Sequence, residues 1–180
     1  MSRPELTALP TAAFPARLHW MAVFQKPGRD VALLATTQLV CFLILTGCEP
    51  GFFIIHLYQT LPYVAILLLV GYSLDRWAYA IGGLVSFVWL VLAYIAGLLD
   101  SAVERLRTHA NFATTNNFVA VLALLTAALA VLMTVLCRVR WVREGSGRGA
   151  ARRIFLPSLA MVGAYYLVLA HWFWDMIRDA

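Results

Sequence analysis

The sequence predicts an all-α integral membrane protein, a bundle of five transmembrane helices with its N-terminus inside and its C-terminus outside. Three observations lead to this prediction: the composition, the spacing of long apolar runs, and the distribution of basic residues between them. Of the 180 residues, 62% are hydrophobic and 13% are charged, whereas a soluble domain has about 45–50% apolar and about 25% charged residues. A water-soluble fold of this length could not bury so much apolar surface, so lipid must solvate most of it.

Residues 1–30 differ from the rest of the chain. They contain four prolines, and residues 16–26 interleave basic and aromatic side chains, which is typical of a segment that lies on lipid headgroups. A disordered tail fits the same residues equally well. We assign residues 1–30 to an N-terminal cytoplasmic or interfacial segment and residues 31–180 to a five-helix transmembrane domain.

Five apolar runs follow, and a helix needs about 20 such residues to cross a bilayer. The first ends at Cys48-Glu49-Pro50-Gly51, where proline and glycine together indicate a turn. Asp75 and Arg76 separate the second run from the third. A polar connector, residues 100–116, precedes the fourth, and a basic loop precedes the fifth. The predicted spans are residues 31–47, 52–74, 77–99, 117–137 and 154–174.

Basic residues test the number of spans and set the orientation. Five spans place eleven of the fourteen Lys and Arg side chains on one side, and short loops rich in these residues stay in the cytoplasm. We therefore predict the N-terminus inside, in a bacterial cytoplasmic (inner) membrane. The inner set is Arg3, Arg17, Lys26, Arg29, Arg76, Arg138, Arg140, Arg143, Arg148, Arg152 and Arg153, and the outer set is Arg105, Arg107 and Arg178.

Small residues recur at four-residue intervals along the third span. Such spacing lets helix backbones approach closely, which drives association where lipid removes the hydrophobic driving force. We expect this seam to pack against other helices of the bundle, against other membrane subunits, or in a homo-oligomer. Its residues are Ala78, Gly82, Ser86, Ala93 and Gly97.

The second span is the most polar. Four polar side chains recur at helical spacing and share one face, and polar groups in hydrocarbon usually face the bundle interior or a cavity. Pro62 removes a backbone donor and leaves the carbonyl of Tyr58 without its helical partner. Interhelical hydrogen bonds or a ligand site would explain the polar face, which comprises His56, Gln59, Thr60 and Tyr63.

Three histidines fall near the outer membrane face under this topology. His56 and His171 could hold a haem b axially, or a copper or zinc ion with His109 as a third ligand. No paired HxH or HExxH spacing accompanies them. A structural role, with separate hydrogen bonds, is the alternative.

The stretch Arg107-Thr108-His109-Ala110-Asn111-Phe112-Ala113 resembles the R-x-H-A-N-F segment of the membrane-associated proteins in eicosanoid and glutathione metabolism. That resemblance implies a four-helix enzyme that activates glutathione thiolate. The family follows the segment with glutamate, where this chain has Thr114, and holds it on the cytosolic side, where our topology places it outside.

The function with the most support in the sequence is a non-catalytic subunit of a larger membrane complex. A cofactor-holding subunit is the first alternative, and a small transporter or channel with a pore along Gln38, His56 and Gln59 is the second. The sequence shows neither a serine beside a base nor a glycine-rich phosphate loop, so we lean against an enzyme. A basic groove with stacking aromatics is also missing, so we expect no nucleic-acid partner.

Overall fold

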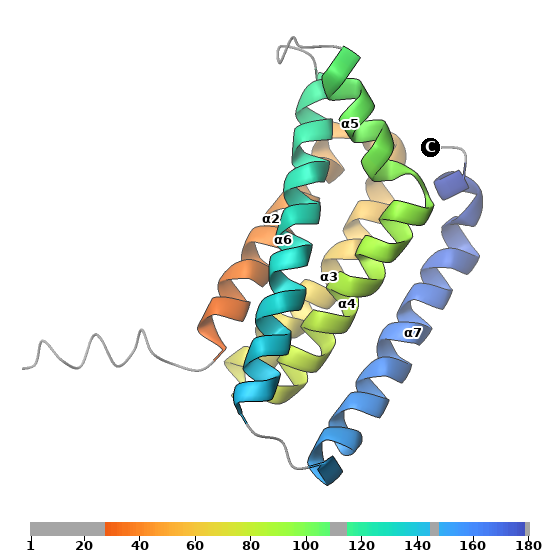
Figure 1. The fold of residues 1–180 in the computed structure, drawn as a ribbon. Helices are drawn as coiled ribbons and strands as arrows, with labels where there is room; N and C mark the ends of the chain where they lie inside the picture. Colours follow the sequence, from red (N-terminus) through yellow and green to blue (C-terminus); the bar gives the residue numbers. More distant parts are fainter. Residues whose placement is uncertain (1–27, 109–114, 145–147, 179–180) are drawn as a thin grey trace, which may run out of the picture.

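A computed structural model describes residues 28–108, 115–144 and 148–178. The chain is helical in these ranges apart from short turns (Figure 1). Five of its helices are long and apolar enough to cross a membrane, which confirms the predicted all-helical class and the number of candidate spans. Residues 1–27 of the N-terminal segment, and His109, lie outside the described residues. The elements are α2 (Arg29–Cys48), the short 3-10 helix η1 (Pro50–Phe52), α3 (Phe53–Gly71), α4 (Asp75–Ile95), α5 (Leu98–Thr108), α6 (Thr115–Arg143) and α7 (Arg148–Arg178).

Four of the long helices form a closed ring. Helix α2 packs against α3, α3 against α4, α4 against α6, and α6 back against α2. Helix α7 lies outside the ring, where α4 is its main neighbour (Figure 1). The apolar window of α7 is 22% buried, whereas that of α4 is 50% buried. The ring therefore contains the core, and α7 is attached to one side of it.

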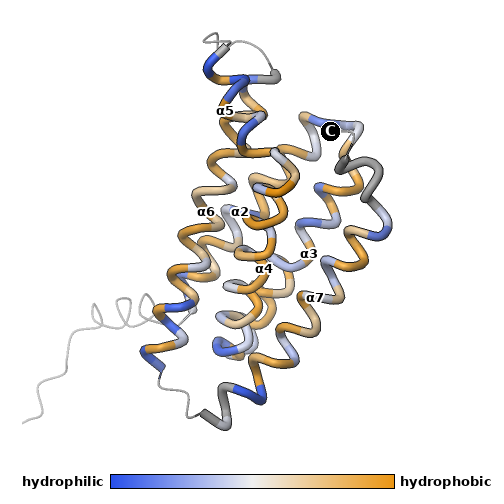
Figure 2. The backbone as a smooth tube through the Cα atoms, turned by 45° about the vertical axis from the view of Figure 1, so that its right-hand side comes forward, coloured by the Kyte–Doolittle hydropathy of each residue, from blue (hydrophilic) through white to orange (hydrophobic). Residues whose placement is uncertain are grey.

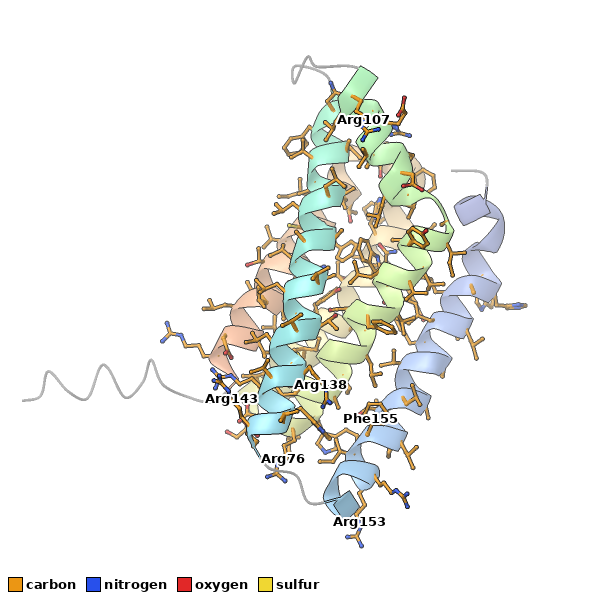
Figure 3. The ribbon with its side chains drawn as sticks, in the orientation of Figure 1. Arg76, Arg107, Arg138, Arg143, Arg153 and Phe155 are labelled. Atoms are coloured by element: carbon orange, nitrogen blue, oxygen red, sulfur yellow. The ribbon has the colours of Figure 1, made fainter. Side chains whose placement is uncertain are left out.

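Hydropathy varies along the helices as a membrane requires. Apolar residues occupy the middle of the bundle, and polar residues gather at its two ends (Figure 2). Arg76, Arg138, Arg143 and Arg153 lie at one end, and Arg107 lies at the other (Figure 3). This separation agrees with successive helices that run in opposite directions across a bilayer.

The region after α4 differs from the predicted connector. We expected a span to Leu99 and then a polar linker, but α4 ends at Ile95 and residues 98–108 form the separate helix α5. Gly97 adopts a left-handed φ of +68° and donates its N–H to the Tyr94 carbonyl, a geometry that terminates helices and favours glycine. Helix α5 packs against α6 beyond the apolar zone, because its mixed sequence has one apolar side and one charged side.

The polar ends of the other spans are also more helical than expected. Helix α6 continues from the predicted end at Cys137 to Arg143, and α7 begins at Arg148 rather than at Ile154. The second span stops three residues early, at Gly71, since Ser73 has a positive φ of 58° that breaks the helix. Basic side chains favour helical C-terminal turns, which explains why arginines extend α6.

Candidate functional site

Polar side chains from all four ring helices meet inside the bundle. Gln38 of α2, Tyr63 of α3, Ser86 of α4 and Thr126 of α6 are each no more than 1% exposed. Gln38 donates its Nε2 hydrogen to the Thr126 carbonyl at 3.0 Å. The Tyr63 hydroxyl lies close to the Ser86 and Gln38 side chains, although neither forms a hydrogen bond of good geometry with it. We call these four residues the central polar cluster.

Three oxygens of this cluster are buried without a hydrogen-bond partner among the described residues: Gln38 Oε1, Tyr63 Oη and Ser86 Oγ. A buried polar group without a partner costs about 1–3 kcal/mol, and native interiors contain few of them. The three groups adjoin one another, so the Tyr63 and Ser86 hydroxyls can donate to Gln38 Oε1 and to each other after small rotations, and the cluster links three helices of the ring.

Aromatic rings enclose the cluster. The Phe42 ring stacks on Tyr63 with centroids 5.7 Å apart and meets Trp89 edge-on at 5.9 Å. The Cys41 thiol, one turn from Gln38, lies close to Thr126. No charged side chain is among these neighbours, so the cluster offers hydrogen bonds without a net charge.

Further unpartnered polar atoms extend from this cluster toward both ends of the bundle. Asp75 Oδ1 is buried on α4 and His56 Nδ1 is buried on α3, each without a partner in the described part of the chain, and Tyr79 Oη is buried on α4 close to the Glu144 carboxylate. Asp75, Tyr79 and Ser86 share one face of α4, because 4 and 11 residues are close to whole numbers of helical turns. His56 and Tyr63 share one face of α3 by the same spacing. We call these groups, with the cluster, the polar line.

The polar line covers most of a bilayer. At about 1.5 Å per residue, Asp75 to Ser86 spans about 16 Å and His56 to Tyr63 about 10 Å. Helices α3 and α4 are antiparallel neighbours, and Tyr63 lies beside Ser86, so the two stretches join end to end. Their combined length of about 26 Å compares with about 30 Å for the hydrocarbon core.

Helix α4 packs closely against α6 and α3 at Gly82, between Tyr79 and Ser86. A Cβ built on Gly82 would lie 3.2 Å from the Sγ of Cys137 and 3.5 Å from the Cδ1 of Ile66. Any side chain at this position would press on Cys137 of α6 and Ile66 of α3. Four of the five predicted seam residues, Ala78, Gly82, Ser86 and Ala93, are buried, while Gly97 lies beyond the end of α4.

Charged side chains surround the line at its arginine-rich end. Arg140 of α6 donates two hydrogen bonds to Asp30 of α2, the Nε bond measuring 2.8 Å. Arg76 donates to the Glu144 carbonyl at 3.3 Å. Gly28 has a φ of +84°, and a Cβ there would collide with the Asp75 carboxylate. These contacts hold the starts of α2 and α4 against the end of α6.

Two tyrosines attach α7 to the ring. The Tyr165 hydroxyl donates to the Tyr58 carbonyl at 2.8 Å, which is the carbonyl that Pro62 leaves without a helical donor. The two rings stack with centroids 4.6 Å apart and planes 7° from parallel. The neighbouring Tyr166 hydroxyl donates to the Val85 carbonyl of α4 at 2.9 Å. The sequence identified the acceptor carbonyl but not its donor, because nothing in a sequence gives the register between α3 and α7.

The histidines have different surroundings. His56 Nε2 lies 3.0 Å from Glu49 Oε2, and the His171 side chain is exposed, with its ring beside Trp172. Among the residues that the structure describes, no group of three or more His, Cys, Asp or Glu side chains is placed to hold a metal ion. His109 and most of the stretch that resembles the glutathione enzymes lie outside the described residues. Shared cofactor ligation by His56 and His171 stays a prediction.

The polar face of α3 divides along its length. Tyr63 and Thr60 are buried, whereas His56 and Gln59 are half-buried. Thr60 donates to the Leu57 carbonyl within its own helix at 2.6 Å. Sequence reasoning chose Tyr63 and Gln38 separately and Ser86 only as a packing residue. Their meeting depends on helix packing, which no local pattern encodes.

Comparison with protein-family models gave no match, and neither curated protein sequences nor solved structures gave a significant match. Function has to be inferred from the buried polar groups themselves.

Proposed function

We propose that this integral membrane protein is a small transporter or channel that lets small polar molecules cross the bilayer along the polar line. The supporting observation is the row of buried polar side chains from Asp75 and Tyr79, through the central polar cluster, to His56. Polar groups inside a membrane are costly, and they commonly mark substrate and ion pathways. Gln38 and His56 belong to this row, as the sequence-based channel hypothesis requires, while Gln59 is half-buried, next to Thr60 and one turn from Tyr63.

The closely packed part of α4 around Gly82 would then separate two polar halves of the path. The apolar stretch from Tyr79 to Ser86 is about 10 Å long, and it is lined by Cys137 and Ile66 at Gly82. A path closed by apolar contacts conducts only when the packed helices shift. Movement of α4 relative to α6 would open it.

Permeability of reconstituted vesicles tests this function. Purified protein in vesicles of phosphatidylethanolamine and phosphatidylglycerol should accelerate osmotic volume changes driven by water, urea or glycerol gradients, measured by stopped-flow light scattering. Ser86→Leu should return the rate to that of protein-free vesicles, because the larger side chain fills the central polar cluster. Ala128→Leu, on the exposed side of α6, is the matched control and should conduct normally. Equal rates for wild-type and protein-free vesicles would refute the proposal.

A second candidate is the non-catalytic subunit of a larger membrane complex, and α7 favours it. This helix has the least buried apolar window of the five spans. Ala160 and Ala164 are exposed on it one turn apart, and a Cβ on Gly163 would meet nothing within 4 Å. Small exposed residues allow another helix, from a partner subunit or a second copy, to approach closely.

Copurification distinguishes this candidate from the first. Protein extracted in mild detergent should retain the same membrane partner, identified by mass spectrometry, and Ala164→Leu should release it. The exposed Ala65→Leu on α3 should retain the partner. Extraction of the chain alone, in wild type and both variants, would exclude a stable complex. Separation of inner and outer bacterial membranes before extraction tests the proposed inner-membrane location.

A further inference from the structure

We infer that an anionic phospholipid binds at the arginine-rich end of the bundle, between α6 and α7, with its phosphate at Arg138 and an acyl chain along α4. The inference does not depend on the proposed transport, because the residues involved lie on the outside of the ring. It combines three observations: an open side of α4, two exposed arginines without acidic partners, and exposed apolar side chains next to them.

The side of α4 between α6 and α7 is open to lipid. Helix α4 packs against both of these helices, whereas α6 and α7 make no extensive contact with each other in the described residues. Gly83 and Phe87 share one face of α4, since they are four residues apart. A Cβ on Gly83 would lie 3.3 Å from the Cβ of Cys137 of α6, and Phe87 is 54% exposed. This face therefore starts beside α6 and continues into lipid.

Two exposed arginines flank the open side. Arg138 extends from α6 and Phe155 from α7 toward the space between these helices (Figure 3). Arg152 precedes Phe155 by three residues and shares its helix face. Arg138 and Arg152 are exposed, and neither forms an ion pair with a carboxylate in the described part of the chain, unlike Arg140, which pairs with Asp30. Their positive charges are therefore available to an anion from outside the protein.

Apolar side chains continue from both arginines toward the middle of the bundle. Val131 lies two turns before Arg138 on the same face of α6, and Leu159 lies two turns after Arg152 on the same face of α7. Both are exposed. Positive charge at the end of the helices, followed by apolar surface toward the middle, matches a phospholipid, whose phosphate lies above its hydrocarbon chains.

The chemistry of the headgroup decides which phospholipid fits. The planar guanidinium of arginine forms paired hydrogen bonds with phosphate oxygens. Phosphatidylglycerol presents its phosphate with a net negative charge, whereas phosphatidylcholine carries a quaternary ammonium that cancels the charge. Basic groups between transmembrane helices bind acidic headgroups for this reason. The site should therefore prefer phosphatidylglycerol.

Native mass spectrometry of the purified protein tests this preference. Phosphatidylglycerol and phosphatidylcholine with identical acyl chains are added in equal amounts, and the lipid that stays bound is identified by its mass. The wild type should retain one phosphatidylglycerol in preference to phosphatidylcholine. Arg138→Gln should weaken that retention about fivefold, and Arg152→Gln should weaken it as well. Equal retention of the two lipids by the wild type would refute the inference.

Arg143→Gln is the matched control, because it removes the same charge from the same end of α6. Arg143 lies on the side of α6 that faces away from α7 (Figure 3). This variant should retain phosphatidylglycerol as the wild type does. A loss as large as that of Arg138→Gln would show that the arginines attract acidic lipid only through their total charge, and would overturn the inference.

Thermal melting in detergent separates lipid binding from folding and from free phosphate. Without added lipid, Arg138→Gln should melt at the temperature of the wild type. Phosphatidylglycerol should raise the melting temperature of the wild type more than that of Arg138→Gln. Glycerol 3-phosphate carries the charge without acyl chains and should produce no such difference. An equal difference with glycerol 3-phosphate would assign Arg138 to a soluble phosphate compound and reject the lipid site.

Discussion

Tyr165 donates its hydroxyl hydrogen to the Tyr58 carbonyl, 2.8 Å away on another helix. Pro62 has no N–H for that carbonyl, so a residue 107 positions along the chain takes the place of the missing helical donor. The helix-breaking residue and the docking of α7 are thus parts of one arrangement.

Tyr165→Phe should lower the free energy of unfolding by about 0.6–1.7 kcal/mol, the range for an interhelical hydrogen bond in a membrane protein. In a Pro62→Ala background the cost should fall, because the introduced alanine supplies a helical N–H for the Tyr58 carbonyl. Tyr58→Phe, which removes a longer bond of 3.4 Å, should have a smaller effect. Equilibrium unfolding in micelles measures all three, and an equal cost in both backgrounds would contradict the relationship.

Gly82→Leu should destabilise the bundle by about 1–3 kcal/mol or more, the usual cost of overpacking. The reason is the 3.2 Å approach of Cys137 Sγ to a Cβ at this position. Gly163→Leu is the matched control, since a Cβ there meets nothing within 4 Å. Thermal melting of both variants checks the prediction, and similar melting temperatures would remove the seam from the packing of α4.

Arg140→Gln should destabilise the protein by about 0.2–1 kcal/mol. Arg140 and Asp30 are 35% and 32% exposed, and ion pairs this accessible contribute little because water screens them. The loss should shrink in high salt. Exposed Arg143→Gln is the control, with no expected change. Unfolding titrations at two salt concentrations provide the measurement, and a salt-independent loss would indicate packing rather than charge.

His56 should act through Glu49. His56→Ala and Glu49→Gln should each cost about 1 kcal/mol or less and should be non-additive, since the two side chains share one 3.0 Å contact. The visible spectrum of the purified protein tests the alternative role. A haem absorption band lost in both His56→Ala and His171→Ala would establish the shared cofactor site instead.

Reporter fusions at Gly147 and Thr108 should report opposite compartments, with Gly147 inside. The arginine bias sets the side, and the structure separates Arg143 and Arg107 to opposite ends of the bundle (Figure 3). Fusions that report the same compartment would contradict five crossings.

Hydropathy alone located the five candidate spans. A segment in lipid must satisfy its backbone hydrogen bonds within itself, so it forms a long helix, and its side chains must be apolar. Helix ends were less predictable. Gly97 looked like one more small residue of a seam, and only its positive φ shows that it ends α4. The contact of Gln38, Tyr63 and Ser86 could not be predicted, because it depends on how helices distant in sequence rotate and slide against one another.

The position of α7 outside a closed ring has a consequence for biosynthesis. Ribosomes deliver the ring helices before α7, so α2, α3, α4 and α6 can assemble in the bilayer while the last segment is still being made. Until Tyr165 arrives, the Tyr58 carbonyl has no donor from α7, and Val85 lacks its bond from Tyr166. A ribosome that stalls before residue 165 would leave the ring complete but two of its backbone carbonyls, of Tyr58 and Val85, without their donors from α7, a feature by which membrane quality control could recognise the unfinished protein.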